Sequence, residues 1–216
     1  MHSKTSNEIE KKLIEKLSDS QKEAVMANSK YIKVIAGAGA GKTETLTRRM
    51  AKLILIDNVN PEDIVAFTFT EKAAQNMKER LYEIVEKITG NQNETSRISK
   101  IYIGTIHGFA KNALEEYYGF GIHKVLDENQ EFALLMKHGW HMGLREWEHD
   151  YSESIQAFRR TFNMVLDERL NENELDKSPR FNEQKKSYKA LLRNLRLMTF
   201  STIIDKAVKN IEENPK

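Results

Sequence analysis

In the first half of the chain, short apolar runs alternate with segments whose apolar residues recur every three or four positions. The runs predict strands, and the helical spacing predicts a helix after each strand. The predicted strands are 31–35, 64–69 and 101–104, and the predicted helices are 46–56, 71–88 and 106–118. Strands that alternate with helices imply a parallel sheet with right-handed crossovers, so the expected fold class is an open α/β layer.

The second half of the chain has a different pattern. Beyond about residue 120 every strong periodicity is helical, which predicts helices over 127–142, 152–170, 182–198 and 201–211, with a polar interhelical loop over 171–179. At the start of the chain, 8–17 is expected to be an amphipathic helix, and Ser18 to Gln21 forms an S-x-x-Q capping box that begins another.

Length and composition limit the possible classes of protein. The chain has 216 residues, enough for one core with a smaller appended subdomain. Its 39% hydrophobic and 31% charged residues fit a soluble globular protein, and no apolar run approaches the length of a membrane span. No signal-peptide pattern opens the sequence, so we expect a cytoplasmic protein. Because cysteine is absent and the six histidines show no paired ligand spacing, metal is expected to bind only through oxygen ligands.

Charge is nearly balanced over the whole chain but not locally. The 34 basic and 32 acidic residues give a net charge of +2, which neither requires nor excludes nucleic acid. One stretch is distinctly cationic. Between residues 177 and 196 the single acidic residue is Glu183, whereas seven residues are basic: Lys177, Arg180, Lys185, Lys186, Lys189, Arg193 and Arg196.

A glycine-rich segment follows the first predicted strand and opens the first predicted helix. The segment Ala36-Gly37-Ala38-Gly39-Ala40-Gly41-Lys42-Thr43 has the spacing of a P-loop, with Ala36 where the strict pattern has glycine. Glycines let the backbone wrap a phosphate, and the amides of the helix amino terminus attract an anion. In such a loop Lys42 reaches the β- and γ-phosphates and the Thr43 hydroxyl binds Mg²⁺. The alternative is a strand-to-helix turn with a surface lysine.

A P-loop alone does not define a reaction, because kinases, GTPases and mechanical ATPases share it. The sequence has no Asn-Lys-x-Asp motif for reading guanine, which leaves a small-molecule kinase or a nucleic-acid motor.

Four segments in order resemble the UvrD/Rep-type superfamily 1 DNA helicases and their RecB/AddA relatives. They are Leu17-Ser18-Asp19-Ser20-Gln21, the loop from Ala36 to Thr43, the run Thr68-Phe69-Thr70-Glu71-Lys72-Ala73-Ala74-Gln75-Asn76-Met77, and Gly104-Thr105-Ile106-His107-Gly108-Phe109. Beside a P-loop, the third segment is close to diagnostic. The resemblance implies an ATP-dependent translocase that moves 3′ to 5′ along single-stranded DNA, with ATP and Mg²⁺ as cofactors.

The resemblance also implies roles for individual residues. Gln21 would read adenine, although its amide also completes the capping box. The nucleotide-binding set would be Gln21 with the loop Ala36, Gly37, Ala38, Gly39, Ala40, Gly41, Lys42, Thr43 and the adjacent Glu44, and Lys42 and Thr43 would serve catalysis.

The expected DNA-binding residues lie at the ends of the second and third predicted strands. Phe69 would stack on a base while Thr68 and Thr70 bind phosphates, and Thr105 and His107 would contact DNA. The alternative for each residue is a structural role in place of DNA contact. Phe69 would then lie in the core, Thr105 would cap a helix, and His107 would pack against its neighbours without a ligand.

An ATPase of this kind needs an Asp–Glu pair after a buried strand. Asp127-Glu128 and Asp167-Glu168 are the candidates, but neither follows an adequate apolar run, so both are expected to be helix-end or helix-surface acids. By resemblance, the pair would follow a stretch like 200–205. The chain is therefore expected to be a fragment with weak nucleotide binding and negligible turnover.

By resemblance the chain comprises the first part of a RecA-like P-loop domain (1–118), a helical insertion (119–199) and a helix that returns to the RecA-like domain (200–216). A second RecA-like domain, single-stranded DNA and duplex DNA are the implied partners. The insertion of family members helps to hold duplex DNA, so the face with Lys185, Lys189, Arg193 and Arg196 either binds phosphates or is merely solvated. The rival functions are a small P-loop phosphotransferase, for which Arg159 and Arg160 are weak candidates, and a binding module without chemistry.

Overall fold

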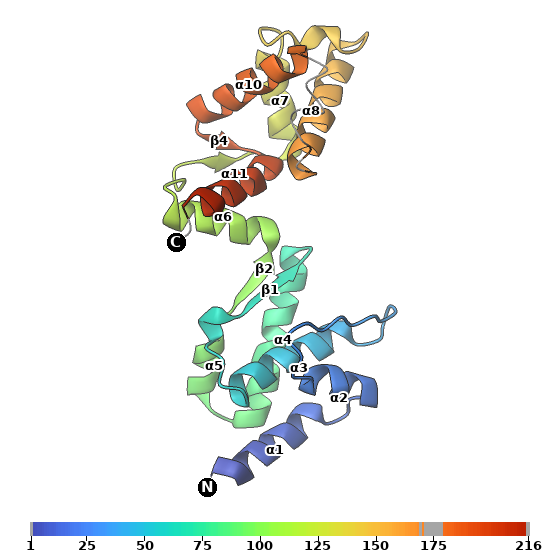
Figure 1. Cartoon of the computed structure of the whole chain (residues 1–216), viewed down its shortest axis with the longest axis vertical. Helices are drawn as coiled ribbons and strands as arrows, with labels where there is room; N and C mark the ends of the chain where they lie inside the picture. Colours follow the sequence, from blue (N-terminus) through green and yellow to red (C-terminus); the bar gives the residue numbers. More distant parts are fainter. Residues whose placement is uncertain (1, 169, 171–178, 215–216) are drawn as a thin grey trace. The chain divides into compact units, whose positions relative to one another are not determined.

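The computed structural model describes residues 2–168, 170 and 179–214. The chain divides into two compact units, Met1–Ile106 and His107–Lys216. Within the described residues the protein is mostly helical, and each unit contains one small parallel sheet of two strands (Figure 1). None of the described helices combines the length and apolar character needed to cross a membrane.

Unit 1 contains five helices, a 3₁₀ turn and the first sheet in its described part. The helices are α1 (His2–Ile14), α2 (Asp19–Met26), α3 (Lys42–Leu55), α4 (Glu71–Thr89) and α5 (Gln92–Ile98), the turn is Pro61–Asp63, and the strands are β1 (Val65–Thr68) and β2 (Tyr102–Thr105). The strands predicted over 64–69 and 101–104 and the helix predicted over 71–88 are confirmed within one or two residues.

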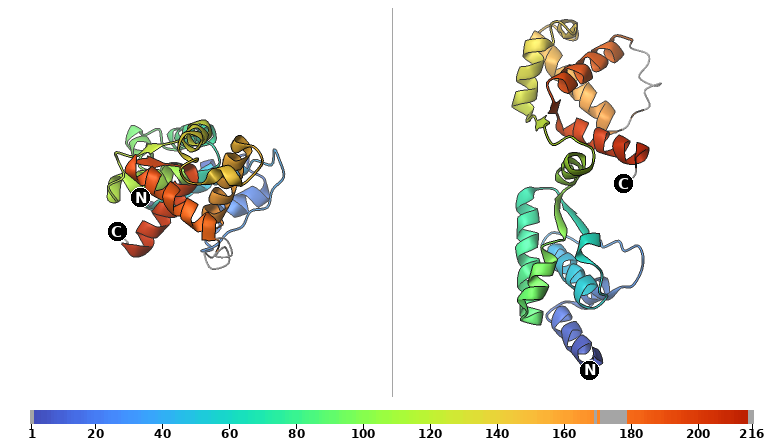
Figure 2. Two further views of the ribbon diagram at one scale, coloured as in Figure 1. Left: turned by 90° about the horizontal axis from the view of Figure 1, so that it is seen from above. Right: turned by 90° about the vertical axis from the view of Figure 1, so that its left-hand side faces the viewer.

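The sheet of unit 1 brings the ends of two distant segments together. β1 and β2 are parallel, with Val65 opposite Tyr102 and Thr68 opposite Thr105. Their carboxyl ends therefore lie side by side, although 37 positions separate them in the sequence. Helix α4 lies along this sheet, as the two views in Figures 1 and 2 show.

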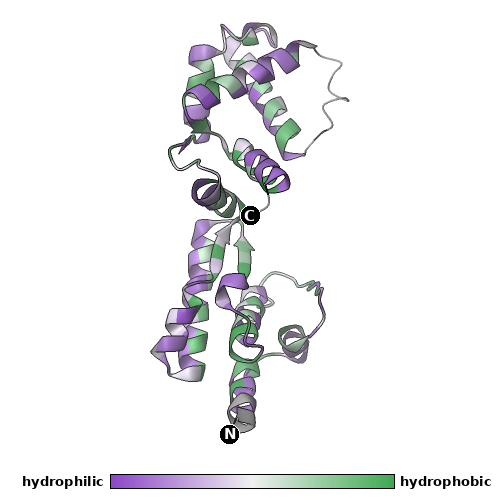
Figure 3. Cartoon of the chain, turned by 60° about the vertical axis from the view of Figure 1, so that its left-hand side comes forward, coloured by the Kyte–Doolittle hydropathy of each residue, from purple (hydrophilic) through white to green (hydrophobic). Residues whose placement is uncertain are grey.

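Local signals explain where the helices of unit 1 begin and end. Ser18 caps α2 and forms the predicted capping box with Gln21. Thr70 caps α4, whose last turn ends at Gly90 with φ of 59°, a left-handed conformation that glycine adopts without strain. The apolar stripes of α1, α3 and α4 then meet in one core in which Leu13, Ala51 and Leu81 are fully buried or nearly so. Figure 3 shows these hydrophobic stripes on the helices.

The strand predicted over 31–35 is wrong. No strand forms there, and the described structure gives this stretch no backbone hydrogen bond. The side chains of Tyr31 and Ile35 are 83% and 86% exposed. An apolar run becomes a strand only when a neighbouring backbone pairs with it, and no described strand lies beside this run.

Unit 2 contains five described helices and the second sheet. The helices are α6 (Ile106–Tyr117), which begins at the last residue of unit 1, α7 (Glu128–His138), α8 (Tyr151–Asp167), α10 (Pro179–Asn194) and α11 (Phe200–Glu213), with a 3₁₀ turn at Leu144–Glu146. The helical prediction for this half is confirmed. The predicted loop over 171–179 lies outside the described residues, except for Pro179, which begins α10.

Two short strands interrupt the helices of unit 2, and the sequence pattern did not predict them. β3 (Lys124–Val125) pairs in parallel with β4 (Leu197–Met198). The larger core of the unit contains the fully buried rings of Phe158, Phe162 and Tyr188. A smaller cluster joins α6 to α11 through Leu114 and Ile203.

The domain boundaries expected from the sequence remain a prediction. The expected insertion (119–199) and the expected return helix (200–216) both lie in unit 2. Unit 2 also contains most of α6, which was expected to belong to the first part (1–118).

The proposed basic face of 182–198 does not form as expected. Helix α10 ends at Asn194, so Arg196 lies beyond it with φ of 54°, and Lys185 is only 5% exposed, with its ammonium 5.9 Å from the centre of the Phe181 ring.

Candidate nucleotide-binding site and strand-end surface

The glycine-rich segment forms a curled loop between α2 and α3. It turns at Ala38–Gly39, and Gly39 and Gly41 have φ of 74° and 77°, in the left-handed region that favours glycine. The ammonium of Lys42 bends back into the loop and donates to the carbonyls of Ala36 at 3.2 Å and Gly37 at 2.7 Å. The backbone therefore curves around the position of the lysine Nζ atom.

The loop ends at an uncapped helix. Gly41 is the N-cap of α3 and has no side chain to accept a hydrogen bond. In the part of the chain that the structure describes, the first-turn amides of Lys42, Thr43 and Glu44 have no acceptor. Free first-turn amides and the helix dipole together favour an anion at this position. The residues present therefore fit a phosphate group.

Gln21 joins the start of α2 to this loop. Its Oε1 accepts from the backbone amide of Ser18 at 2.9 Å, and its Nε2 donates to the carbonyl of Ala40 at 3.0 Å. A Cβ atom on Gly41 would lie 2.6 Å from the same Nε2 atom, so a larger residue there would displace the Gln21 amide, and the φ of 77° also favours glycine. The capping prediction is confirmed, and the contact with the loop is a further finding.

Glu44, which the resemblance placed in the nucleotide-binding set, forms ion pairs with two arginines. Its carboxylate pairs with Arg48 on the next turn of α3 and lies 3.6 Å from the guanidinium of Arg80 on α4. Arg48 also donates to backbone carbonyls of Lys12 and Leu13 at the end of α1. This network joins α1, α3 and α4 directly behind the loop, and the sequence pattern did not reveal it.

Thr43 is the one expected metal ligand. Its side chain is exposed, and the hydroxyl makes no hydrogen bond within the described residues. A free hydroxyl at the first turn of α3 fits the role of one oxygen ligand to Mg²⁺, which takes most of its other ligands from water and phosphates. No group of three His, Asp or Glu side chains among the described residues could hold a metal ion by itself.

A cavity of about 460 Å³ lies beside the loop lysine. Ile32, Val34 and Leu46 form the apolar part of its wall, and the basic residues Lys30, Lys42 and Arg49 line it as well. The sequence reasoning did not identify Lys30 or Arg49. Arg49 donates to three carbonyls at the end of α2, which joins α3 to that end of α2.

Phe69 lies at the end of β1 and is fully exposed, at 103% of the reference accessible area. The alternative of a core residue is therefore excluded. Phe67, two positions earlier, is 45% exposed and makes an edge contact with Tyr102. A fully exposed ring that follows a strand offers a flat apolar surface to a ligand.

The threonines around Phe69 shape the loop between β1 and α4. The Thr68 hydroxyl donates to the carbonyl of Thr70 at 2.9 Å, and the Thr70 hydroxyl accepts from the amide of Ala73 at 3.1 Å as the cap of α4. The Thr105 hydroxyl donates to the Glu71 carboxylate at 2.8 Å. These hydroxyls are engaged within the protein, so they support the loop that carries Phe69.

His107 lies in the first turn of α6 in unit 2. Its side chain is exposed, and its ring contacts the edge of the Phe200 ring at 5.5 Å between centroids. The ring is therefore accessible and is not part of the core.

The candidate acids are helix-end residues, as expected. Asp127 caps α7 and forms a capping box with Gln130, and Glu128 pairs with Arg159 at 2.9 Å. Asp167 ends α8 and accepts from the Ser201 hydroxyl at 3.2 Å.

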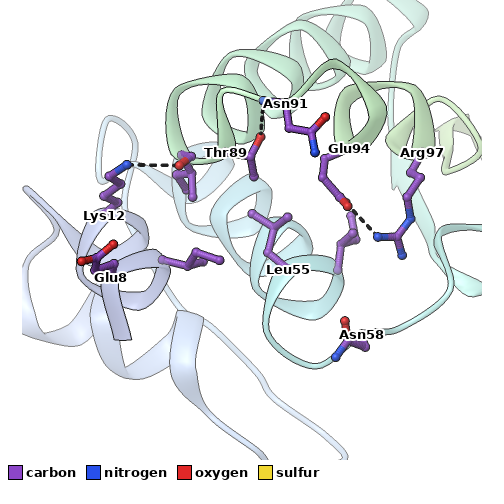
Figure 4. Close-up of a pocket in the computed structure, with 11 residues that line it drawn as sticks. Glu8, Lys12, Leu55, Asn58, Thr89, Asn91, Glu94 and Arg97 are labelled. Atoms are coloured by element: carbon purple, nitrogen blue, oxygen red, sulfur yellow. Dashed lines mark hydrogen bonds and ion pairs between the residues drawn. The ribbon is translucent and has the colours of Figure 1, made fainter. Parts of the chain in front are cut away.

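A separate cavity of about 290 Å³ lies among α1, α3, α4 and α5 (Figure 4). Several of its polar groups already have partners: Lys12 donates to the carbonyl of Ile88 at 3.2 Å, and Arg97 pairs with Glu94 at 2.8 Å. It therefore offers fewer free ligand-binding groups than the loop does.

The curled loop, its inward lysine and the uncapped α3 are the features of a P-loop protein. The chain belongs to the UvrD/REP helicase N-terminal domain family, whose model matches residues 17–216. The resemblance inferred from the four segments is confirmed.

Three relatives illustrate the similarity. DNA helicase II of Escherichia coli (strain K12) is 37% identical over 125 residues, 57% of this chain and 15% of that protein. ATP-dependent DNA helicase SRS2 of Saccharomyces cerevisiae is 39% identical over 118 residues, 54% of this chain and 9% of that protein. DNA helicase II of Haemophilus influenzae is 34% identical over 129 residues, 58% of this chain and 17% of that protein. The matched region thus spans a small fraction of each relative's length.

Proposed function

We propose that this chain is the ATP-binding part of a DNA helicase, a motor that moves 3′ to 5′ on single-stranded DNA by ATP hydrolysis. The observation that carries the proposal is the curled loop, in which the Lys42 ammonium faces inward and the first-turn amides of α3 find no acceptor among the residues that the structure describes. Family membership and the names of the relatives support DNA as the partner.

In this proposal the loop from Ala36 to Thr43 binds the phosphates of ATP. When a nucleotide binds, the Lys42 ammonium exchanges the two loop carbonyls for phosphate oxygens, which are stronger acceptors because they are charged. Thr43 supplies a hydroxyl ligand to Mg²⁺, and Mg²⁺ neutralises phosphate charge. Glu44 keeps its ion pairs with Arg48 and Arg80, which hold α3 in place, and does not contact the nucleotide.

Gln21 can hold the loop and read adenine at the same time. A side-chain amide has two N–H donors and two lone pairs on its oxygen. The capping bond uses one lone pair and the bond to Ala40 uses one donor. One donor and one acceptor remain, and these are the groups that pair with the N7 and N6 positions of adenine. In this proposal the capping box and adenine recognition use different hydrogen-bonding positions of the same amide.

Single-stranded DNA is proposed to contact the ends of β1 and β2. Phe69 supplies the stacking surface, because a base can cover a ring that the fold leaves fully exposed. The hydroxyls of Thr68 and Thr105 donate within the protein and position this loop. The Thr70 hydroxyl accepts from Ala73, so its own hydrogen can be donated to a phosphate, and backbone amides supply further donors. His107, exposed at the start of α6, is proposed as a further DNA contact.

Turnover by this chain is proposed to be negligible, because its candidate acids have structural roles. Asp127 caps a helix and Glu128 is paired with Arg159, so neither is available to polarise a water molecule. The same pairing argues against a small phosphotransferase, because Arg159 would have to leave Glu128 and Glu131 to contact a phosphate.

The nucleotide proposal is tested by ATP binding to the full chain, measured with a fluorescent ATP analogue and competition by ATP and GTP. Lys42→Ala is expected to weaken binding at least tenfold, whereas the control Lys11→Ala, an exposed lysine of α1, should not change it. Competition should be stronger with ATP than with GTP, and Gln21→Ala should remove that preference. Equal affinity of the Lys42→Ala variant and the control would refute the proposed site.

The DNA proposal has a separate test with the same protein. Stacking of one base is worth about 1–3 kcal/mol, so Phe69→Ala should lower the affinity for single-stranded DNA about 5- to 150-fold without changing the melting temperature. Tyr117→Ala, which removes another half-exposed aromatic ring on α6, is the control and should leave the affinity unchanged.

A further inference from the structure

A half-buried lysine of α11 lines a cleft within unit 2. The cleft has a volume of about 650 Å³ and lies between α10 and α11, and Lys206 is one of its lining residues. The Nζ atom of Lys206 lies 4.9 Å from the centre of the Phe120 ring. In the described part of the chain this atom makes no hydrogen bond and no ion pair. The amine is therefore held beside an aromatic ring, at a cleft, without an acceptor.

The charges around Lys206 are mostly positive. Lys189 and Arg193 of α10 and Lys209 of α11 line the same cleft. Asp205 lies 3.6 Å from Lys189 and 3.0 Å from Lys209, so its carboxylate is shared between two other ammonium groups. The further titratable side chains near the site are Lys186 and Glu213 of the cleft and His123, whose ring lies 4.8 Å from that of Phe120.

This setting lowers the pKa of Lys206 below the ordinary 10.5. Burial is the largest cause, because it disfavours the charged ammonium, and the positive charges of Lys189, Arg193 and Lys209 act in the same direction. Asp205 raises the pKa and offsets part of the effect. At neutral pH a larger fraction of Lys206 than of an ordinary lysine is therefore the neutral amine, which is the nucleophilic form.

We propose that Lys206 is acylated by acyl phosphates, and that Arg193 and Lys189 hold the phosphate group of the reagent. The amine nitrogen of Lys206 attacks the carbonyl carbon and forms a C–N bond, and the bond from that carbon to the phosphate oxygen breaks. The phosphate leaves with the proton that the nitrogen loses, as hydrogen phosphate. The products are an amide and free phosphate, so the reaction needs no oxidant or reductant.

The charges of the cleft favour an acyl phosphate over a neutral acylating agent. Arg193 has no carboxylate within ion-pair distance among the described residues, so its guanidinium can pair with an incoming phosphate. The same cations stabilise the departing phosphate. Acylation also converts the ammonium of Lys206 into a neutral amide, which removes a charge that burial and three cations disfavour. The proposal does not depend on nucleotide binding at the loop of unit 1.

The test is reaction of the full chain with acetyl phosphate, with peptide mass spectrometry to measure the initial rate of acetylation at each lysine. Lys137, an exposed lysine of α7 that does not line the cleft, is the reference in the same sample. At neutral pH Lys206 should react at least tenfold faster than Lys137. Because its pKa is lowered, the rate at Lys206 should stop rising at a pH below 10.5. With the neutral reagent N-acetoxysuccinimide the preference for Lys206 should remain but be smaller.

Two variants separate the reactivity of the amine from the binding of phosphate. Arg193→Gln should slow the reaction of Lys206 with acetyl phosphate more than its reaction with N-acetoxysuccinimide, whereas the control Arg160→Gln, at an exposed position outside the cleft, should change neither. Asp205→Asn removes the group that raises the pKa of Lys206, so Lys206 should react a few-fold faster with both reagents.

Three results would overturn the proposal. The first is a rate at Lys206 no higher than that at Lys137, which a lysine that merely packs on Phe120 would give. The others are equal effects of Arg193→Gln and Arg160→Gln, and an Asp205→Asn variant in which Lys206 reacts no faster. Circular dichroism of each variant shows whether the fold is retained. Failure of ATP to bind at the loop would leave these rates unchanged, so the two proposals fail separately.

Discussion

At the scale of single residues, Gly41 illustrates how closely the loop is built around its neighbours. Its φ of 77° is in the left-handed region, and an added Cβ atom would approach Gln21 to 2.6 Å. Gly37 lies in the same loop without a positive φ, and an added Cβ atom there meets nothing within 4 Å. The two glycines therefore form a matched pair for substitution.

We expect Gly41→Ala to lower the free energy of unfolding of unit 1 by about 1–3 kcal/mol, because a left-handed alanine is strained. Gly37→Ala should change it by less than about 0.5 kcal/mol, as surface substitutions usually do. Urea unfolding followed by circular dichroism measures both. Equal effects of the two substitutions would show that the loop adjusts to the extra atom.

A buried carboxylate in unit 2 predicts a dependence of stability on pH. Glu131 is 4% exposed, accepts a hydrogen bond from the Tyr188 hydroxyl at 2.9 Å and lies 3.7 Å from the Arg159 guanidinium. Its pKa is raised above the ordinary 4.5, chiefly because burial disfavours the charged form, although Tyr188 and Arg159 act in the opposite direction. The folded chain thus binds this proton more tightly than the unfolded chain does.

The contribution of Glu131 to stability is therefore full below pH 4.5 and is lost as the pH rises through the folded pKa. Glu131→Gln keeps an acceptor for Tyr188 and does not titrate. We expect the stability of this variant relative to the parent to increase as the pH is raised from 4 to 8. Chemical unfolding at several pH values measures this, and a constant difference would contradict the assigned cause.

At the scale of elements, the capping box of α2 does more than begin a short helix. Ser18→Ala removes the cap, and we expect a loss of about 1 kcal/mol in stability, since a helix of eight residues depends strongly on its ends.

Gln21→Glu keeps the oxygen that accepts from Ser18 but removes the donor to Ala40, so it should spare the cap and weaken ATP binding. Unfolding and nucleotide-binding measurements separate the two; a Gln21→Glu variant with unchanged ATP affinity would show that the bond to Ala40 is dispensable.

The elements that the sequence predicts well are those with local signals. Helix α4 carries its cap at Thr70 and its stop at Gly90, so its bounds can be read from the chain itself. The glycine-lysine spacing likewise predicts the phosphate loop. Contacts between distant segments are not encoded locally: Gln21 with Ala40, Glu44 with Arg80, and the pairing of β3 with β4 depend on how the helices pack. The run 31–35 was mispredicted for the same reason, because strand formation depends on a neighbour.

At the scale of the whole molecule, the two units have separate hydrophobic cores. Unit 1 is built around residues such as Leu81 and Val85 of α4, and unit 2 around the rings of Phe158, Phe162 and Tyr188. A domain with its own core can fold on its own. Cooperative unfolding of each unit is therefore the expected behaviour, with two transitions for the chain.

Both tryptophans, Trp140 and Trp147, belong to unit 2, so their fluorescence reports on that unit alone, whereas circular dichroism reports on the helices of both. Leu81→Ala should cost about 2–5 kcal/mol by leaving a cavity, and should shift the dichroism transition of unit 1 without moving the fluorescence transition. Phe158→Ala should cost about 3–5 kcal/mol and move the fluorescence transition instead. If each substitution moved both signals together, the two cores would unfold as one cooperative unit, and the independent folding expected from their separate packing would be refuted.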